Sequence, residues 1–167
     1  MKAHQLLQAV SKDLQTEIIS YLHTEHAGAY NMVLSSLAQH RKLRPVFLQR
    51  KAPAEQFAWV LTLLHGRMMN SLAEQVMQIW LLKNQQDMLA TFLDAVGIEH
   101  KKGEVESLPD EITDDKAAAG VAALLAKFPA EKAAVYLHMF QLQREGGWPS
   151  IAKAIEAEPK LTLNVVA

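Results

Sequence analysis

Apolar residues recur at helical spacing along most of the chain. The first stripe repeats every four residues and predicts one long helix near the N-terminus: Leu6, Val10, Leu14, Ile18 and Leu22. A second helix, which Thr24 can cap, is predicted from Tyr30, Val33, Leu34 and Leu37. Pro45 ends this helix, because the residue before a proline is pushed out of the helical region, and it opens a short third helix, PVFLQRK.

The same order of elements recurs twice along the chain. A helix opens at Pro53, and two more follow before Gly97, which suits a left-handed C-terminal cap. Thr113 or Asp114 can cap the first helix of a third round. Three units of helix, central helix and short helix can therefore be written, at residues 3–51, 53–97 and 113–157.

These patterns predict an all-α protein of eight to nine helices in a single domain, residues 1–167. A chain of 167 residues, half of them apolar, has the size of one ordinary domain and can bury a substantial core. Two architectures remain open. One is a plain helical bundle, and the other is a short α-α superhelical array in which the three units are a true repeat.

Two segments interrupt the helical pattern. A polar loop at residues 98–112 separates the second unit from the third, and Lys102-Gly103 within it suits the tight turn of a short two-stranded ribbon. The C-terminal KLTLNVVA, residues 160–167, favours extended structure. Neither segment is long enough to change the predicted fold class.

Acidic residues crowd the polar loop. The spacing does not fit an EF-hand calcium loop, because the positions that should hold oxygen ligands hold Val96, Ile98 and Val105. We expect a solvated connection that can be shortened between Glu99 and Glu111 at little cost, since loop-closure entropy changes slowly with length. The alternative is a partner-binding or catalytic loop, with these contact candidates: Glu99, Glu104 and Glu106.

Basic residues crowd the segment at residues 40–51, HRKLRPVFLQRK, which contains no acid. We expect Leu43, Val46 and Phe47 to point inward there. The segment can bind a phosphate group or an acidic partner, or it can be a solvated face whose long side chains cover apolar surface. Its candidate partner-binding residues are Arg41, Lys42, Arg44, Arg50 and Lys51.

A metal site has weaker support. His23 and His26 lie three residues apart, and Glu25 could join them at a turn between two helices. The Glu-x-x-His and His-Glu-x-x-His patterns of di-iron bundles and zinc proteases do not occur. Histidines in such places more often cap helices or face water, so the metal-dependent helical-bundle enzyme is the alternative hypothesis, and we expect no cofactor.

Composition narrows the remaining classes of function. Lysine and arginine number 17 against 18 acidic residues, so no global field attracts nucleic acid or anionic lipid. The chain has no cysteine, no membrane-length apolar run and no glycine-rich phosphate loop. Trp59, Trp80 and Trp148 fall at positions expected to pack, which gives an aromatic nucleic-acid platform no support.

The sequence therefore favours a macromolecular-interaction protein of the adaptor or scaffold type over an enzyme. We expect a cytoplasmic protein whose partner is another protein, with nucleic acid and membrane disfavoured. The opposite charges of the segment at residues 40–51 and the polar loop also allow head-to-tail self-association into a homo-oligomer. Partner, pathway and substrate are not encoded in any recognisable pattern.

Overall fold

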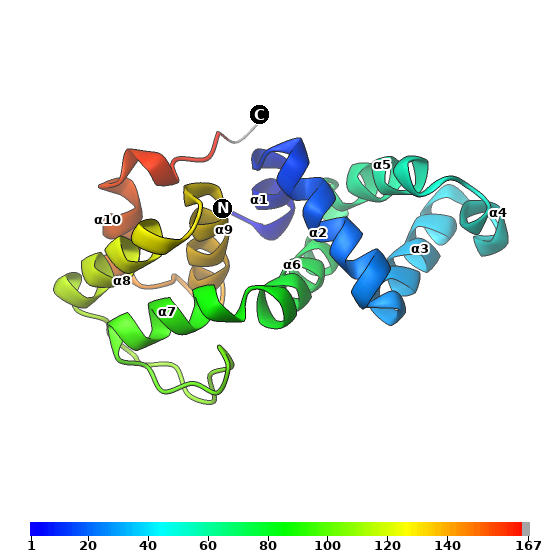
Figure 1. Cartoon of the computed structure of the whole chain (residues 1–167). Coiled ribbons are helices and arrows are strands. Elements are labelled where there is room, and N and C mark those ends of the chain that lie inside the picture. The colour runs from blue at the N-terminus through cyan, green and yellow to red at the C-terminus, as the bar shows by residue number, and fades with distance from the viewer. Residues whose placement is uncertain (165–167) are drawn as a thin grey trace. The chain divides into compact units, whose positions relative to one another are not determined.

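The computed structural model describes residues 1–164, and this part of the chain is all-α (Figure 1). The protein is 73 % helical, and its described residues form ten helices, nine of them with seven or more residues. The all-α prediction is confirmed, and the number of helices is close to the predicted eight to nine.

The described residues divide into two compact units. One unit consists of Lys2–Trp80, and the other consists of Leu81–Asn164 with Met1. The boundary lies within helix α6 (Asn70–Asn84). It therefore falls inside the second of the three units written from the sequence, and the three-unit repeat and the single domain stay predictions.

The N-terminal unit, residues 2–80, begins with a helix pair where the sequence pattern predicted one long helix. Ser11 separates the two helices, because its side-chain oxygen accepts a hydrogen bond from the Leu14 N–H at 3.2 Å and caps the second helix. The Gln15 side chain also donates to the Val10 carbonyl at 2.9 Å. This helix pair is α1 and α2. In order along the chain, the elements of this unit are α1 (Ala3–Ala9), α2 (Lys12–Glu25), α3 (Ala27–Arg41), α4 (Pro45–Gln49), α5 (Pro53–Leu64), the 3-10 turn η1 (Arg67–Met69) and the first part of α6.

The cap predicted at Thr24 is wrong, whereas the proline boundary is confirmed. Thr24 lies inside α2 and donates from its hydroxyl to the Ser20 carbonyl at 2.9 Å, so it cannot cap α3. Pro45 occupies the first turn of α4, and α3 ends before it with Lys42 in the left-handed conformation. The core of this unit includes the fully buried Ile18, Leu22, Leu37 and Leu64.

The C-terminal unit, residues 81–164, packs four helices around a group of aromatic rings. The elements are α7 (Gln86–Val96), α8 (Asp114–Lys127), α9 (Ala130–Gln141), α10 (Pro149–Glu156) and the 3-10 turn η2 (Pro159–Leu161). Phe140 is stacked on Trp148 at a centroid distance of 4.7 Å and meets Phe92 edge-on at 5.2 Å. Gly97 and Thr113 cap the ends of α7 and α8 that face the polar loop, as predicted.

The loop at residues 98–112, which we call the acidic segment, exposes most of its charged side chains but also makes contacts with its own unit. Ile98 and Ile112 are buried at its two ends. The Trp148 indole N–H donates to the Pro109 carbonyl at 3.0 Å, and the Arg144 guanidinium donates to the Asp110 carbonyl. These contacts join the acidic segment to the aromatic core, and the expectation that it can be shortened between Glu99 and Glu111 at little cost stays a prediction to be tested.

The predicted ribbon is reduced to a single pair of residues. Lys101 and Glu104 form an antiparallel bridge, with N–H···O distances of 2.8 and 3.0 Å. Lys102 and Gly103 both have positive φ at the turn between them, as a tight hairpin turn requires. His100 supports the turn by accepting from the Gly103 N–H at Nδ1, at 3.1 Å, while its Nε2 bonds to Asp94 at 2.7 Å.

The C-terminal stretch begins as a 3-10 turn at Pro159–Leu161, with Leu161 buried, where extended structure was expected. The end of that stretch, residues 165–167, lies outside the described residues. Within residues 1–164 no helix combines the length and the apolar character that crossing a bilayer requires.

Candidate functional site

The short helix α4 lies between α3 and α5 along the chain (Figure 1). Leu48 is its only fully buried side chain. The Gln56 side-chain amide donates to the carbonyls of Leu48 and Lys51 at 3.0 and 2.9 Å and so holds the end of α4 against α5. Its oxygen accepts a bond of 2.7 Å from the Tyr30 hydroxyl. Burial raises the pKa of Tyr30 to about 12, which keeps this donor protonated.

The expectation that Val46 and Phe47 point inward is wrong. Val46 is 49 % exposed and Phe47 is 54 % exposed. The reason is geometric, because a helix of five residues makes little more than one turn and has room for one inward position. Leu48 takes that position, and its two apolar neighbours are left in contact with water.

Basic side chains lie over the aromatic rings beside α4. The Arg41 guanidinium carbon is 4.9 Å from the centroid of the Trp59 ring, and the Lys51 ammonium is 4.6 Å from it. Lys51 also lies 5.3 Å from the Phe47 ring and 3.1 Å from the Glu55 carboxylate. Trp59 is only partly buried, while Trp80 and Trp148 are buried as expected.

A cavity of about 230 Å³ adjoins Arg41 on the side of α5 and η1. Leu37, Leu63, Met68 and Met69 form its apolar lining, and His40, Arg41 and Arg67 contribute the basic part of its lining. Met68 is 89 % exposed, the largest exposure among the large apolar side chains described. We call the whole region the basic surface; it consists of His40, Arg41, Lys42, Arg44, Val46, Phe47, Arg50, Lys51, Trp59, Arg67, Met68 and the cavity.

The five basic residues singled out in the sequence all lie in this region. Arg41 ends α3 and Lys42 caps it, Arg44 precedes α4 and Arg50 follows it. All four are exposed, and Lys51 is half-buried against the aromatic rings.

Sequence reasoning missed three members of the basic surface: Trp59, Arg67 and Met68. Met68 and Arg67 belong to a break between helices, GRMMN, where two consecutive methionines follow a helix-ending glycine. Apolar side chains in such a break have no helical stripe to join. That feature could have indicated an exposed site.

The acidic candidates Glu99, Glu104 and Glu106 are also brought together, but in the C-terminal unit. They line a hollow of about 300 Å³ with His100 and Lys101. All three carboxylates are exposed, and the acidic segment contributes none of the exposed large apolar side chains among residues 1–164. The hollow is therefore a polar surface on a tightly fastened loop.

The metal candidates do not converge. The His23 ring packs edge-on against Tyr30 at 4.8 Å and Phe57 at 5.4 Å, Glu25 ends α2, and His26 joins α2 to α3. Across residues 1–164 there is no group of three or more histidine, aspartate or glutamate side chains placed to hold a metal ion. The geometry gives the metal-dependent alternative no support.

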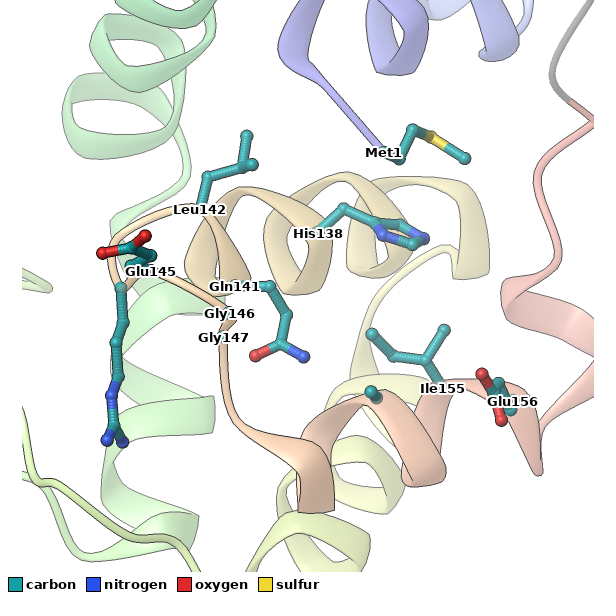
Figure 2. Close-up of a pocket in the computed structure, with 11 residues that line it drawn as sticks. Met1, His138, Gln141, Leu142, Glu145, Gly146, Gly147, Ile155 and Glu156 are labelled. Carbon is teal, nitrogen blue, oxygen red and sulfur yellow. The ribbon is translucent and has the colours of Figure 1, made fainter.

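A hollow of about 530 Å³ in the C-terminal unit lies between α9 and α10. Figure 2 shows His138 and Gln141 on α9 facing Ile155 on α10, with Gly146 and Gly147 at the turn between them. Gln141 has a structural role, because it bonds the Trp148 carbonyl at 3.0 Å and the Trp148 N–H at 2.7 Å. Burial lowers the pKa of His138, which favours the neutral imidazole.

No protein-family model, curated protein or solved structure matches the chain. The functional argument therefore depends on the residues and geometry described above.

Proposed function

We propose that the protein is a macromolecular-interaction module that binds another protein through its basic surface. The observation that carries the proposal is that cationic and exposed apolar side chains lie together on α3, α4 and α5 and on the 3-10 turn η1 that follows them. Six large apolar side chains are substantially exposed among residues 1–164, and three of them belong to this surface: Val46, Phe47 and Met68. Exposed apolar groups of this kind mark interaction sites when they gather in a patch.

The aromatic residue, methionine and arginines of the basic surface support this proposal. Aromatic residues, methionine and arginine are enriched in such interfaces, where they contribute most of the binding energy. Single-stranded nucleic acid is a less suitable partner, because its bases stack on free aromatic faces. Here the side chains of Arg41 and Lys51 lie over the Trp59 ring, and Lys51 also contacts the Phe47 ring, so these faces are less open to bases.

The proposal favours an adaptor over an enzyme. The hollow between α9 and α10 has its glutamine engaged in holding a turn, and His23, Glu25 and His26 belong to helix packing and a helix junction. The proposal also includes a cytoplasmic location, which fractionation of the producing cells would test.

Affinity capture from the producing cells tests the proposed function. The tagged protein is compared with a variant in which three exposed arginines are reversed: Arg44→Glu, Arg50→Glu and Arg67→Glu. We expect the variant to lose proteins that the unaltered protein captures, because reversed charge on an interface repels an acidic partner.

A matched control reverses three exposed lysines of the C-terminal unit: Lys83→Glu, Lys127→Glu and Lys160→Glu. This control should capture the same proteins as the unaltered chain, provided that both variants melt at the same temperature. Equal losses in the two variants would show that capture depends on overall charge, and the basic surface would lose its assigned role.

A further inference from the structure

The cavity beside Arg41 has features that charge alone does not explain. Leu63 and Leu37 are buried at its wall, Met69 is half-buried, and Met68 is almost fully exposed. A methionine side chain is flexible and polarizable, so it adapts to apolar groups of different shape. An apolar wall of this kind next to three basic residues fits a ligand that has both an apolar and an acidic part.

We propose that the cavity receives a large apolar side chain from an acidic amphipathic segment of another protein. The inserted side chain contacts Leu63, Met68 and Met69, while carboxylates on either side of it bind Arg41 and Arg67. Phe47 and Val46 extend the contact along α4. This inference rests on the proposed function, because it names the chemistry of the partner that the basic surface binds.

The charge distribution argues against a second copy of this chain as the occupant. A two-fold dimer through this face would bring Arg41, Lys51 and Arg67 of one copy against the same basic residues of the other, and like charges across an interface are unfavourable. Head-to-tail docking of the acidic segment supplies the carboxylates but no apolar anchor. Ile98 and Ile112 are buried in their own unit, and Val105 and Leu108 are half-buried.

Three fluorescent peptides of about 16 residues, long enough to form a helix, test the inference by fluorescence anisotropy with the full chain. The first has leucine and phenylalanine on one helical face and glutamate on the other. The second has lysine in place of each glutamate, and the third has serine in place of each apolar residue. We expect the first peptide to bind at least about tenfold more tightly than the other two, which corresponds to about 1.4 kcal/mol.

Two methionine variants test the position of the site. Met68→Asp should weaken binding of the first peptide by about tenfold or more, because it places a negative charge and removes an apolar contact at the cavity. Met32→Asp is the matched control, since Met32 is 43 % exposed and does not line the cavity. It should leave the affinity within about twofold of that of the unaltered chain.

The remaining outcomes distinguish this inference from the proposed function. If the serine peptide binds as tightly as the first peptide, or if Met68→Asp has no effect, the cavity takes no apolar anchor and the inference is wrong. Charge-dependent capture of a protein from cells would survive that result. If a single-stranded RNA oligonucleotide binds more tightly than the first peptide, the ligand of the cavity is RNA and the inference is wrong. If sedimentation shows a dimer that Met68→Asp disrupts, the occupant is a second copy of this chain and the inference is also wrong.

Discussion

The acidic segment and the basic surface both contain many charged residues and few apolar ones, but they differ in whether those apolar residues are buried. Both come from charged stretches with only a few large apolar residues. The acidic segment buries Ile98 and Ile112 and bonds its backbone to Trp148 and Arg144. The basic surface leaves Val46 and Phe47 exposed and lays its cations over the Trp59 ring.

In our account, the location of the apolar residues separates a structural loop from a proposed interaction surface. Charge density does not separate them, because charged side chains reach water in both cases. Apolar residues that find a place in the core fasten a loop to its unit, and apolar residues without one remain available to a partner. The predictions below test this distinction.

Among changes to the acidic segment and to exposed residues of the basic surface, replacing residues 99–111 by a short glycine linker should have the largest effect. We expect a loss on the order of 3 kcal/mol, because the change removes the half-buried Val105 and Leu108 and leaves the Trp148 indole N–H without the Pro109 carbonyl. Urea denaturation followed by circular dichroism measures it. A control that neutralises only exposed charge, Glu104→Gln with Glu106→Gln, should change stability by less than about 0.5 kcal/mol.

A loss below about 1 kcal/mol for the glycine linker would contradict the account, because it would mean that the acidic segment is the solvated connection that its composition suggests.

Gly103→Ala should destabilise the protein by about 1–3 kcal/mol, as strained backbone positions typically do. Gly103 has φ of +88°, and an added Cβ would lie 2.8 Å from Leu89 in α7. Gly28→Ala is the matched control, since Gly28 lies in α3 with nothing near its added Cβ. It should stabilise the helix by about 0.5–1 kcal/mol. Thermal melts of both variants measure these effects. If the two melting temperatures shifted in the same direction, the strained conformation assigned to Gly103 would be wrong.

Acidification should weaken both units slightly. Burial lowers the pKa of His65 in the N-terminal unit and that of His138 in the C-terminal unit below the usual 6.5. The unfolded chain therefore binds these protons more readily, and stability that is complete above about pH 6.5 is lost as the pH falls below it. Because both side chains are partly hydrated, we expect less than about 1 kcal/mol from each.

Denaturation at pH 7.5 and pH 5.5 checks this sign, with His65→Gln and His138→Gln as variants. Each substitution should reduce the difference between the two pH values. A larger pH dependence in either variant would mean that the histidine is stabilised as the cation.

The smallest effect on stability should come from the basic surface. Val46→Ser with Phe47→Ser should change the free energy of unfolding by less than about 0.5 kcal/mol per residue, because both side chains are already exposed. Leu48→Ala on the same helix should cost about 2–5 kcal/mol, because Leu48 is fully buried. A cost for the exposed pair as large as that of Leu48→Ala would show that these residues belong to the core.

Sequence pattern predicted the fold class and most helix boundaries because prolines and caps act locally. Pro45, Pro149 and Thr113 determine helix ends through their own backbone geometry or side-chain oxygen. The break at Ser11 was missed because the four-residue spacing of the apolar residues continues across it. A hydrophobic pattern alone cannot show a break that leaves this spacing unchanged.

The sequence identified the basic residues of the candidate site but not the aromatic and apolar residues beside them. The segment at residues 40–51 contains all five basic residues, but their relation to Trp59, Arg67 and Met68 depends on how α3, α4 and α5 pack. The outward direction of Phe47 follows from the burial of Leu48 and the bonds of Gln56, which lies eight residues further along the chain. Such long-range constraints are absent from a hydrophobic pattern.

Photocrosslinking in the producing cells tests the central claim most directly. A photoreactive phenylalanine analogue is placed at Phe47 in the basic surface or at Ser107 in the acidic segment, both exposed positions. The account predicts a discrete crosslinked protein from position 47 and none from position 107. A crosslink from position 107 alone would contradict it and move the interaction site to the acidic segment.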